Sequence, residues 1–553
     1  MKIKRIPMLL LAIVMTASVF AGCKQKEAEK TTDKLDAKQE INIVGYDYTS
    51  LDPSVVSDAE SFTTLNNVME GLMVEVSKDG KATNVLAGAS DMKKNADSTV
   101  YTFTIRDSKW SDGVPVKAQD YVFSWRRLCD PATAADYMYF LDEIGVKNGL
   151  EVAEGKVKPD QLGIKAIDDK TLEVTLAQPT PAFEAALSFK GLVPQREDKF
   201  KALGDQYGQD ITKMVYNGAF TVSEYQKGSK IVYKKNPNYW NAKDIKLSQA
   251  NCFIINEPTT LVKMFETKEL DMTGATGDDV KKLTDEAAKG TFKHVTGMEA
   301  SVFYYTYNTK SPILKNAKVR LALSLAYDRQ TQIDAVWKRF VPAYGLVPSK
   351  VMLGTSEYRS QVPEPLKDVK DDPKTLLAEG LAELGVKASA VKLKMIFGPA
   401  TSTSKAQGDF IQQQMQKNLG IAIELSYAVD GPAYFKARTK GEFDICAGGW
   451  GADYNDVASF FPLFTSSNGN NNGKYSSAKY DELVSAAGKE MDPAKRVVKY
   501  QEAEKLLLVT DAAVSPYFYK DVHSFQHNYL KGMYLPLFGG YYDLRGVYVS
   551  GKE

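Results

Sequence analysis

Side chains that bind metal ions are scarce in this chain of 553 residues. It has three histidines, His294, His523 and His527. The last two lie four residues apart, but no glutamate follows the first of them, as it would in the zinc-protease pattern. The four cysteines form no Cys-x-x-Cys pair. The sequence therefore predicts no metal site and no cofactor.

Recognisable catalytic motifs are also missing. The sequence has no Gly-x-Ser-x-Gly, no phosphate-binding loop of the Walker type and no dinucleotide-binding fingerprint. We therefore expect a protein that is not an enzyme. An extracellular glycosidase stays open at this point, because a catalytic carboxylate pair cannot be picked out among 69 Asp and Glu residues without geometry.

Neither sign of charge dominates the composition. The 70 Lys and Arg residues against 69 Asp and Glu give a net charge of +1, which offers no support for a nucleic-acid partner. With 44% hydrophobic residues, the composition is that of an ordinary globular protein of three or four domain-sized units. After the first 22 residues, no run is long and apolar enough to cross a membrane.

The N-terminus has the pattern of a secretory signal. Lys2, Lys4 and Arg5 precede a mostly apolar run from Pro7 to Phe20, and two small residues lead into Cys23. The end of this segment resembles the lipobox of bacterial lipoproteins. The resemblance implies cleavage after residue 22, lipid on Cys23 and a place on the outer face of the cell membrane. The alternative is an ordinary signal peptide with an incidental cysteine.

A charged segment follows the predicted signal. Residues 24–40 contain five Lys, five acids and no aromatic residue, so they cannot bury a core. We expect residues 23–40 to be the lipidated cysteine and a flexible tether. The remaining cysteines, Cys129, Cys252 and Cys446, are predicted to be buried thiols, although one disulfide among them stays open.

The clearest secondary structure lies between residues 372 and 450. Asp372-Pro373 begins a predicted helix that ends at Gly385, and a second helix ends at Gly420. Alternating strands are predicted at 391–397 and 421–427, then a short helix after Pro432 and an apolar strand over 443–449. This alternation predicts an α/β lobe around a largely parallel sheet. Further strands are expected at 99–106 and 171–176, and helices near 59–70, 117–128 and 316–327.

Several short motifs are distributed along most of the chain. In chain order they are Leu51-Asp52-Pro53, Glu70-Gly71-Leu72, the stretch from Tyr101 to Val116, Ser124-Trp125-Arg126-Arg127, Asn217-Gly218, the stretch from Lys235 to Trp240, Val319-Arg320, Asp328-Arg329 and the stretch from Gly449 to Tyr454. Each motif is weak alone, but their number, order and spacing are specific. Together they resemble the family 5 extracellular solute-binding proteins of ABC importers, of the oligopeptide-binding type.

The resemblance implies an α/β, two-lobed periplasmic-binding-protein-like fold with mixed sheets, an extra domain and a ligand cleft between the lobes. We expect a discontinuous first lobe from residues 41–60, 184–300 and 520–553. Residues 61–183 are expected to form the additional domain packed on it, and residues 301–519 the second α/β lobe.

The resemblance also places strand edges that would pair with a peptide backbone. These are Gly449-Trp450-Gly451 and the segment that ends at Tyr48. The two glycines would allow a close backbone approach. Trp450 could instead serve only interdomain packing.

Asp453 matches the family carboxylate that pairs with the α-amino group of the peptide. Its alternative role is to cap a turn near Asn455 and Asp456. Tyr137, Tyr305 and Tyr519 fall near family positions that line the cleft, although each could be plain core.

This chain differs from the family at a residue that would bind the terminal carboxylate of the peptide. In the family a basic residue can occur three positions before the motif tryptophan, but this chain has Ala447 there. Arg438 matches a second basic position; its alternative is a solvated charge beside Lys436 and Lys440. We therefore hypothesise a relaxed length limit, or a preference for longer peptides.

The sequence thus predicts a lipid-anchored, monomeric binding protein that captures extracellular oligopeptides and hands them to ABC transporter permease subunits. One alternative is a co-receptor that senses a peptide pheromone. Another is a non-peptide ligand such as a nickel complex, haem or a sugar.

Overall fold

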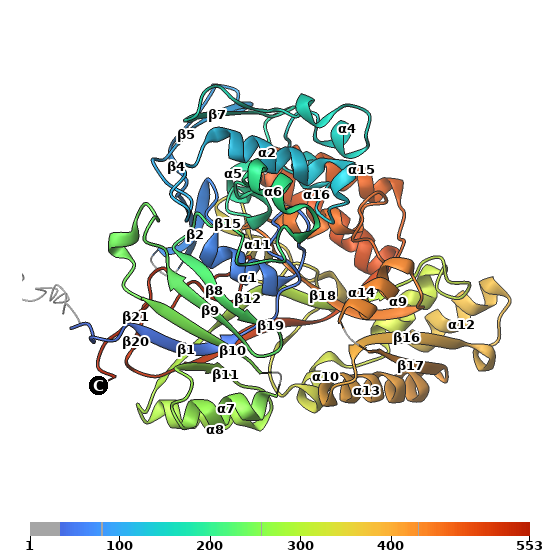
Figure 1. The fold of residues 1–553 in the computed structure, drawn as a ribbon. Coiled ribbons are helices and arrows are strands. Elements are labelled where there is room, and N and C mark those ends of the chain that lie inside the picture. The colour runs from blue at the N-terminus through green and yellow to red at the C-terminus, as the bar shows by residue number, and fades with distance from the viewer. Residues whose placement is uncertain (1–33, 79–80, 256, 430, 553) are drawn as a thin grey trace, which may run out of the picture.

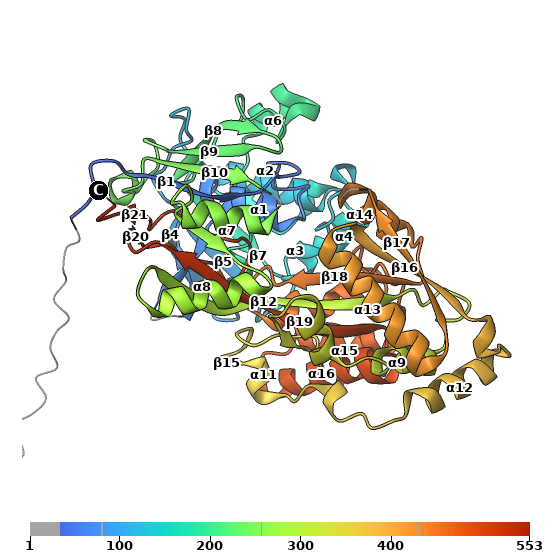
Figure 2. The same ribbon diagram turned by 90° about the horizontal axis from the view of Figure 1, so that it is seen from below.

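The computed structural model describes residues 34–78, 81–255, 257–429 and 431–552 as two lobes and an additional domain (Figures 1 and 2). The first lobe is built on a four-stranded sheet with the order β1-β10-β9-β8, in which only β1 and β10 are parallel. Its strands are β1 (Glu40–Gly45), β8 (Phe220–Gln226), β9 (Lys230–Lys235) and β10 (Gln249–Ile254). Helices α7 (Pro258–Glu266) and α8 (Asp278–Ala288) also belong to this lobe.

The additional domain holds an antiparallel sheet with the order β4-β5-β7-β6. Its elements are β4 (Ala89–Lys94), β5 (Val100–Ile105), α2 (Ala118–Cys129), β6 (Ile164–Ala166) and β7 (Thr171–Thr175). The two predicted strands and the predicted helix in this region are confirmed. Helix α1 (Ala59–Val68) and the hairpin of β2 (Met73–Lys78) and β3 (Lys81–Leu86) precede this sheet.

The second lobe contains the predicted alternation of helices and strands. Its elements are α9 (Ala317–Leu325), α10 (Arg329–Val336), α12 (Pro373–Leu384), β16 (Lys392–Pro399), α13 (Ser402–Leu419), β17 (Ala422–Ala428), α14 (Gly431–Lys440), β18 (Ile445–Gly451), α15 (Ala478–Gly488) and α16 (Pro493–Lys505). The Asp372 carboxylate caps α12 by accepting from the Thr375 amide, and Gly385 ends it with φ 69°. Glycine suits that left-handed position because it lacks a Cβ.

The prediction of a largely parallel sheet was only partly right. The strand order is β11-β19-β12-β18-β16-β17, and only β18, β16 and β17 are parallel neighbours. The antiparallel part consists of β11 (Met272–Gly274), β12 (Lys293–Tyr307), β13 (Val341–Pro342) and β19 (Val514–Gln526). The sheet is mixed because β12 and β19 are long strands that run back and forth between the lobes.

These two strands connect the lobes. One end of β19 pairs with β11, on the side of the first lobe, whereas the far end of β12 pairs with β18 in the second lobe. The β12–β19 ladder is interrupted between Met298 and Val302. A bulge of this kind bends a strand pair, and here it lies where the chain passes from one lobe to the other.

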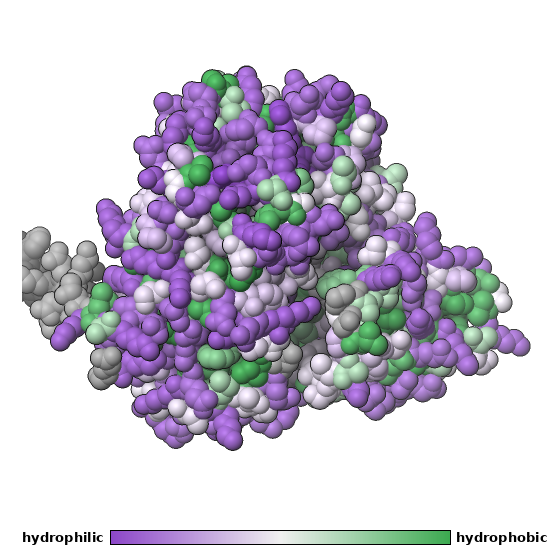
Figure 3. Space-filling model, in the orientation of Figure 1, coloured by the Kyte–Doolittle hydropathy of each residue, from purple (hydrophilic) through white to green (hydrophobic). Residues whose placement is uncertain are grey.

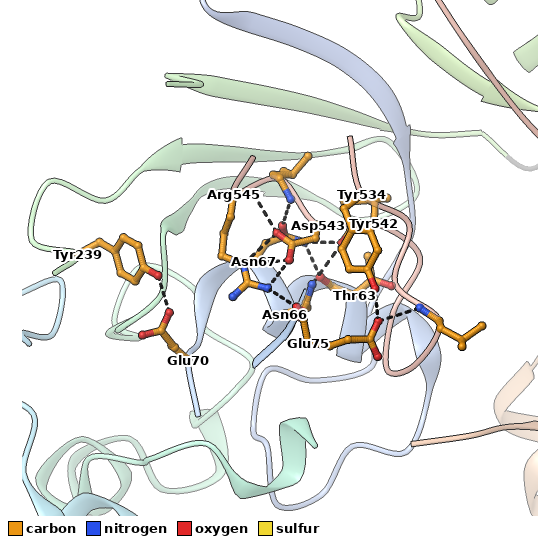
Figure 4. Close-up of polar contacts among 12 residues, drawn as sticks. Thr63, Asn66, Asn67, Glu70, Glu75, Tyr239, Tyr534, Tyr542, Asp543 and Arg545 are labelled. Atoms are coloured by element: carbon orange, nitrogen blue, oxygen red, sulfur yellow. Dashed lines mark hydrogen bonds and ion pairs between the residues drawn. The ribbon is translucent and has the colours of Figure 1, made fainter. Parts of the chain in front are cut away.

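The largest hydrophobic core runs through the first lobe and the additional domain. A smaller core lies under α7 and α8, and further cores lie in the second lobe. A buried polar network joins the C-terminal segment to α1 and β2 (Figure 4). The Glu75 carboxylate accepts from Tyr534 Oη at 2.5 Å and from the Leu537 amide at 3.0 Å. Asn67 donates to the carbonyl of Tyr542 at 3.3 Å and accepts from the Leu544 amide at 2.9 Å.

The end of the predicted tether lies against the C-terminus. The Asp36 amide donates to the carbonyl of Val549, and its carboxylate accepts from the amides of Gly551 and Lys552 at 2.8 Å each. Cys23 and the rest of the tether before residue 34 lie outside the described residues, as does the predicted signal. Among the residues that the structure describes, no helix is long and apolar enough to cross a membrane.

Candidate functional site

The carboxylate of Asp453 lies two residues beyond the end of β18 and is 9% exposed. Its Oδ1 accepts a hydrogen bond of 2.8 Å from Tyr137 Oη, and its amide donates to Ser459 Oγ at 2.8 Å. Asp456, not Asp453, caps the following turn, by accepting from the Ala458 amide. The capping role considered for Asp453 therefore belongs to its neighbour.

Burial controls the charge of Asp453. Burial raises the pKa of this carboxyl to about 7. The hydrogen bond from Tyr137 acts in the opposite direction and lowers the pKa, but its effect is smaller. Within the described ranges, Asp453 forms no ion pair, whereas Asp456 is held by both terminal nitrogens of Arg496. A buried carboxylate without a cation is costly, so an ammonium group from a ligand would stabilise its charged form.

The strand beside Asp453 has an open edge. Along one side β18 pairs with β12 over its whole length. On the other side β16 pairs only with Ile445 and Cys446. The backbone of residues 447–451 therefore has no strand neighbour on that side among the described residues. An extended chain could pair there by adding a strand.

The glycines of β18 have different neighbours. A Cβ on Gly449 would lie 2.8 Å from the Phe303 ring, which is too close. A Cβ on Gly451 would be 3.8 Å from Ser301, an ordinary contact. The packing of Phe303 thus explains the glycine at 449. The predicted role of both glycines in close ligand approach stays a prediction.

Trp450 lies between the cores of the two lobes and packs partly buried against both. Its ring is 6.3 Å from that of Tyr137. The indole Nε1 is buried without a hydrogen-bond partner in the described chain. A buried indole N–H normally finds an acceptor. The interdomain packing of Trp450 is therefore shown, whereas its predicted contact with a ligand stays a prediction.

Tyr48 follows β1 in the first lobe, and its ring stacks on Tyr225 at 4.3 Å. The hydroxyl is buried and, among the described residues, without a partner. Burial raises the pKa of this phenol above its usual range, so it remains a neutral donor. It resembles Trp450 in having an unused polar group.

Arg438 lies on α14 and its guanidinium covers Gly448. The guanidinium carbon is 3.4 Å from the position that a Cβ of Gly448 would occupy. No ion pair to Arg438 is present in the described part of the chain, and its Nε has no hydrogen-bond partner there. Its neighbour Tyr434, one helical turn earlier, also has a buried hydroxyl without a partner. Tyr434 is not among the residues predicted from the sequence, although a spacing of four on a helix indicates a shared face.

Tyr305 and Tyr519 are both buried. The Tyr305 hydroxyl accepts from the side-chain amides of Gln332 and Gln407. The Tyr519 hydroxyl lies 2.9 Å from the carbonyl of Gly345 and 2.8 Å from the Glu364 carboxylate. Protein groups thus satisfy both hydroxyls, in contrast to those of Tyr48 and Tyr434. Their predicted contact with a ligand stays a prediction.

The three cysteines are free and buried, as expected. Burial raises the pKa of Cys129 and of Cys252 to about 12, which keeps both thiols protonated. In the described part of the chain, no group of three or more His, Cys, Asp or Glu is placed to hold a metal ion. His523 lies 2.9 Å from His294, and His527 contacts the carbonyl of Phe265.

The sequence of the chain was compared with protein families and with known proteins. A family model described as bacterial extracellular solute-binding proteins, family 5 Middle, matches residues 84–472. The oligopeptide-binding protein OppA of Bacillus subtilis is 32% identical over 546 residues, with 97% of each chain covered.

Solved structures agree with the fold. OppA of Listeria monocytogenes, bound to peptide, superposes with a TM-score of 0.84 at 32% identity, covering 93% of this chain and 100% of that one. OppA of Haemophilus influenzae, in complex with RPPGFSPFR, gives a TM-score of 0.84 at 28% identity, covering 94% and 100%. The predicted two-lobed α/β fold is thereby confirmed. The chain belongs to the family 5 bacterial extracellular solute-binding proteins.

Proposed function

We propose that this protein captures oligopeptides outside the cytoplasm and delivers them to the permease subunits of an ABC importer. The observation that carries the proposal is the buried Asp453 carboxylate, which lacks a cation in the described chain and lies beside the open edge of β18. A peptide offers what both features need, an α-ammonium group and a row of backbone donors and acceptors. The relatives named above bind oligopeptides, which supports this reading.

Backbone pairing supplies affinity that does not depend on the side chains of the ligand. The unused hydroxyl of Tyr48 and the indole N–H of Trp450 could donate to peptide carbonyls. Arg438 offers a charge near the middle of the open edge, where it would meet a carboxylate.

The chain belongs to a family of solute-binding proteins. We propose that it binds its ligand without catalysing a reaction. We further propose a lipid anchor on Cys23, a monomeric body and the outer face of the cell membrane as its location. The apolar run before Cys23 and the small residues next to it support the anchor. A tether raises the local concentration of the receptor near its permease.

Peptide titration of the purified protein tests the function. Asp453→Asn keeps the size and the hydrogen bond to Tyr137 but removes the charge. We expect it to weaken binding of an unblocked peptide by at least about 100-fold, because an ammonium would lose its buried partner. Asp334→Asn, at an exposed carboxylate on α10, is the matched control and should change nothing.

Equal affinity of the Asn variant and the parent would contradict the role of Asp453. Native mass spectrometry of the parent protein adds an independent readout, since closed lobes retain ligand. Repeated recovery of a metal complex, haem or sugar in place of peptides would overturn the proposal in favour of a non-peptide ligand. A deletion strain that still imports peptides but loses a regulated response would indicate pheromone sensing.

A further inference from the structure

The side chain of Tyr454 crosses from the second lobe into the additional domain. Tyr454 follows β18, directly after Asp453, yet its ring is 1% exposed and belongs to the core that the first lobe shares with the additional domain. The ring meets that of Phe140 edge-on, with centroids 5.8 Å apart. The hydroxyl donates to the Glu143 carboxylate at 2.5 Å. Tyr454 is therefore a second-lobe residue whose side chain is inserted into the other body.

The additional domain fixes its side of this contact. Phe140 and Glu143 are the first and last residues of the short helix α3 (Phe140–Glu143). The Phe140 ring is buried against that of Phe189, with centroids 4.4 Å apart. Because the additional domain and the first lobe share one core, we expect α3 to move with the first lobe.

The second lobe fixes the backbone of Tyr454. Its carbonyl accepts from the Asp456 amide at 2.9 Å. The Asp456 carboxylate in turn accepts from both terminal nitrogens of the buried Arg496 on α16, at 2.7 and 2.6 Å. The turn that carries Tyr454 is thereby attached to α16, so Tyr454 must follow any movement of the second lobe.

Separation of the lobes would withdraw Tyr454 from the additional domain. The lobes are connected by β12 and β19, whose ladder is interrupted between Met298 and Val302, and Figure 3 shows a hollow between the lobes. A strand pair can bend at such an interruption. The movement would expose the tyrosine ring to water and break its hydrogen bond to Glu143. Both losses favour the closed arrangement.

The same segment of the additional domain also reaches the candidate carboxylate. Tyr137, six residues before Glu143, donates to Asp453 Oδ1 at 2.8 Å. Residues 137–143 therefore hold two consecutive residues of the second lobe, Asp453 through Tyr137 and Tyr454 through Glu143. Loss of the second contact would loosen the boundary at which a peptide ammonium would be held.

Resting on the proposed function, we propose that Glu143 is a positioning residue for peptide binding, which acts through Tyr454. By holding this side chain in the additional domain, Glu143 keeps the lobes closed over a peptide and Asp453 in place for its amino group. The peptide leaves only after Tyr454 has separated from Glu143. The contact therefore slows release and leaves association unchanged.

Peptide association and release rates of the parent, Glu143→Ala, Tyr454→Phe and the double variant test the proposal. We expect each single variant to release an unblocked peptide about tenfold faster at an unchanged association rate, because one buried hydrogen bond is lost. The double variant should be no worse than the single ones, since both lose the same contact. Glu143→Gln keeps an oxygen that can accept from Tyr454 and should restore slow release. Glu151→Ala, an exposed change on α4 (Gly149–Ala153) of the same domain, is the matched control.

Thermal unfolding separates this role from a purely structural one. We expect Glu143→Ala to have the Tm of the parent without peptide, but a smaller rise in Tm when peptide is added. An equal loss of Tm with and without peptide would show that the contact is a fixed part of the fold and would overturn the proposal. Release rates equal to those of the parent would also overturn it. Both outcomes leave peptide capture intact, whereas a parent protein that binds no peptide would refute the proposed function itself.

Discussion

The hydroxyl of Tyr137 donates a hydrogen bond of 2.8 Å to the carboxylate of Asp453 and so joins the additional domain to the second lobe. Asp453 reaches its position by following β18, whereas Tyr137 lies more than 300 positions earlier in the chain. The contact therefore depends on how the additional domain and the second lobe pack against each other. It also sets how readily Asp453 carries a charge.

Removal of this hydroxyl should weaken peptide binding. Tyr137→Phe leaves Asp453 buried without its donor, which costs the charged carboxylate about 1–3 kcal/mol. We expect the Kd of an unblocked peptide to rise about tenfold at neutral pH. Isothermal titration measures this change. An N-acetylated peptide is the control, because it has no ammonium and its weak binding should not respond to the substitution.

Peptide binding should depend on pH through Asp453. Burial raises its pKa to about 7 in the free protein, and a bound ammonium favours the charged form. Binding below this pH must therefore release a proton, so affinity rises as pH rises through about 7. It should fall again above about 8, where the α-amino group of the peptide loses its proton. Titrations between pH 5 and 9 measure this profile, and a flat profile would contradict it.

The glycines of β18 should differ in their tolerance of a methyl group. Gly449→Ala places a Cβ 2.8 Å from the Phe303 ring, so the ring must shift. We expect a loss of about 1–3 kcal/mol in the free energy of unfolding. Gly451→Ala meets Ser301 at 3.8 Å and should be nearly neutral. Thermal unfolding of both variants provides the comparison, and equal losses would argue against the role of Phe303.

Arg438 should matter most for peptides that end at the open edge. A carboxylate at about the fifth residue would lie near its guanidinium, whereas a longer peptide passes it with a neutral backbone. Arg438→Met is expected to weaken binding of a five-residue peptide about tenfold and that of a nine-residue peptide less. Lys436→Met, an exposed change on the same helix, is the control. An equal effect on both lengths would show that Arg438 acts on packing alone.

Glu75 should make the stability of the free protein fall as pH rises. Burial raises the pKa of its carboxyl from 4.5 to about 7, so the folded state holds a proton that the unfolded state has lost in this range. The free energy of unfolding therefore decreases between pH 4.5 and 7, by up to about 3 kcal/mol from this group. Glu75→Gln removes the titration and should flatten that part of the curve. Urea unfolding at several pH values measures it, and an unchanged slope would refute the assignment.

The local elements of the second lobe could be predicted because each carries its own signal. Asp372 before a proline begins α12 and Gly385 ends it, while alternation of apolar and polar residues identifies most of β16 and β17. The motif around Trp450 also identified Asp453. Tyr434 was not predicted, because its spacing from Arg438 indicates only a shared helix face, and whether its hydroxyl has a partner depends on the packing around α14.

The sequence by itself determined the family, the identity of the candidate carboxylate and the helix and strand alternation around it. These depend on short motifs and on periodicity, which act over a few residues. Only the tertiary structure decided that Tyr137 meets Asp453, that Phe303 fills the space beside Gly449 and that β16 leaves part of β18 unpaired. Such contacts join segments far apart in the chain, and they form only when the strands of the second lobe pair and the additional domain packs against that lobe. The physical reason is that packing and burial are properties of the closed fold, whereas helix caps and alternation are properties of the local chain.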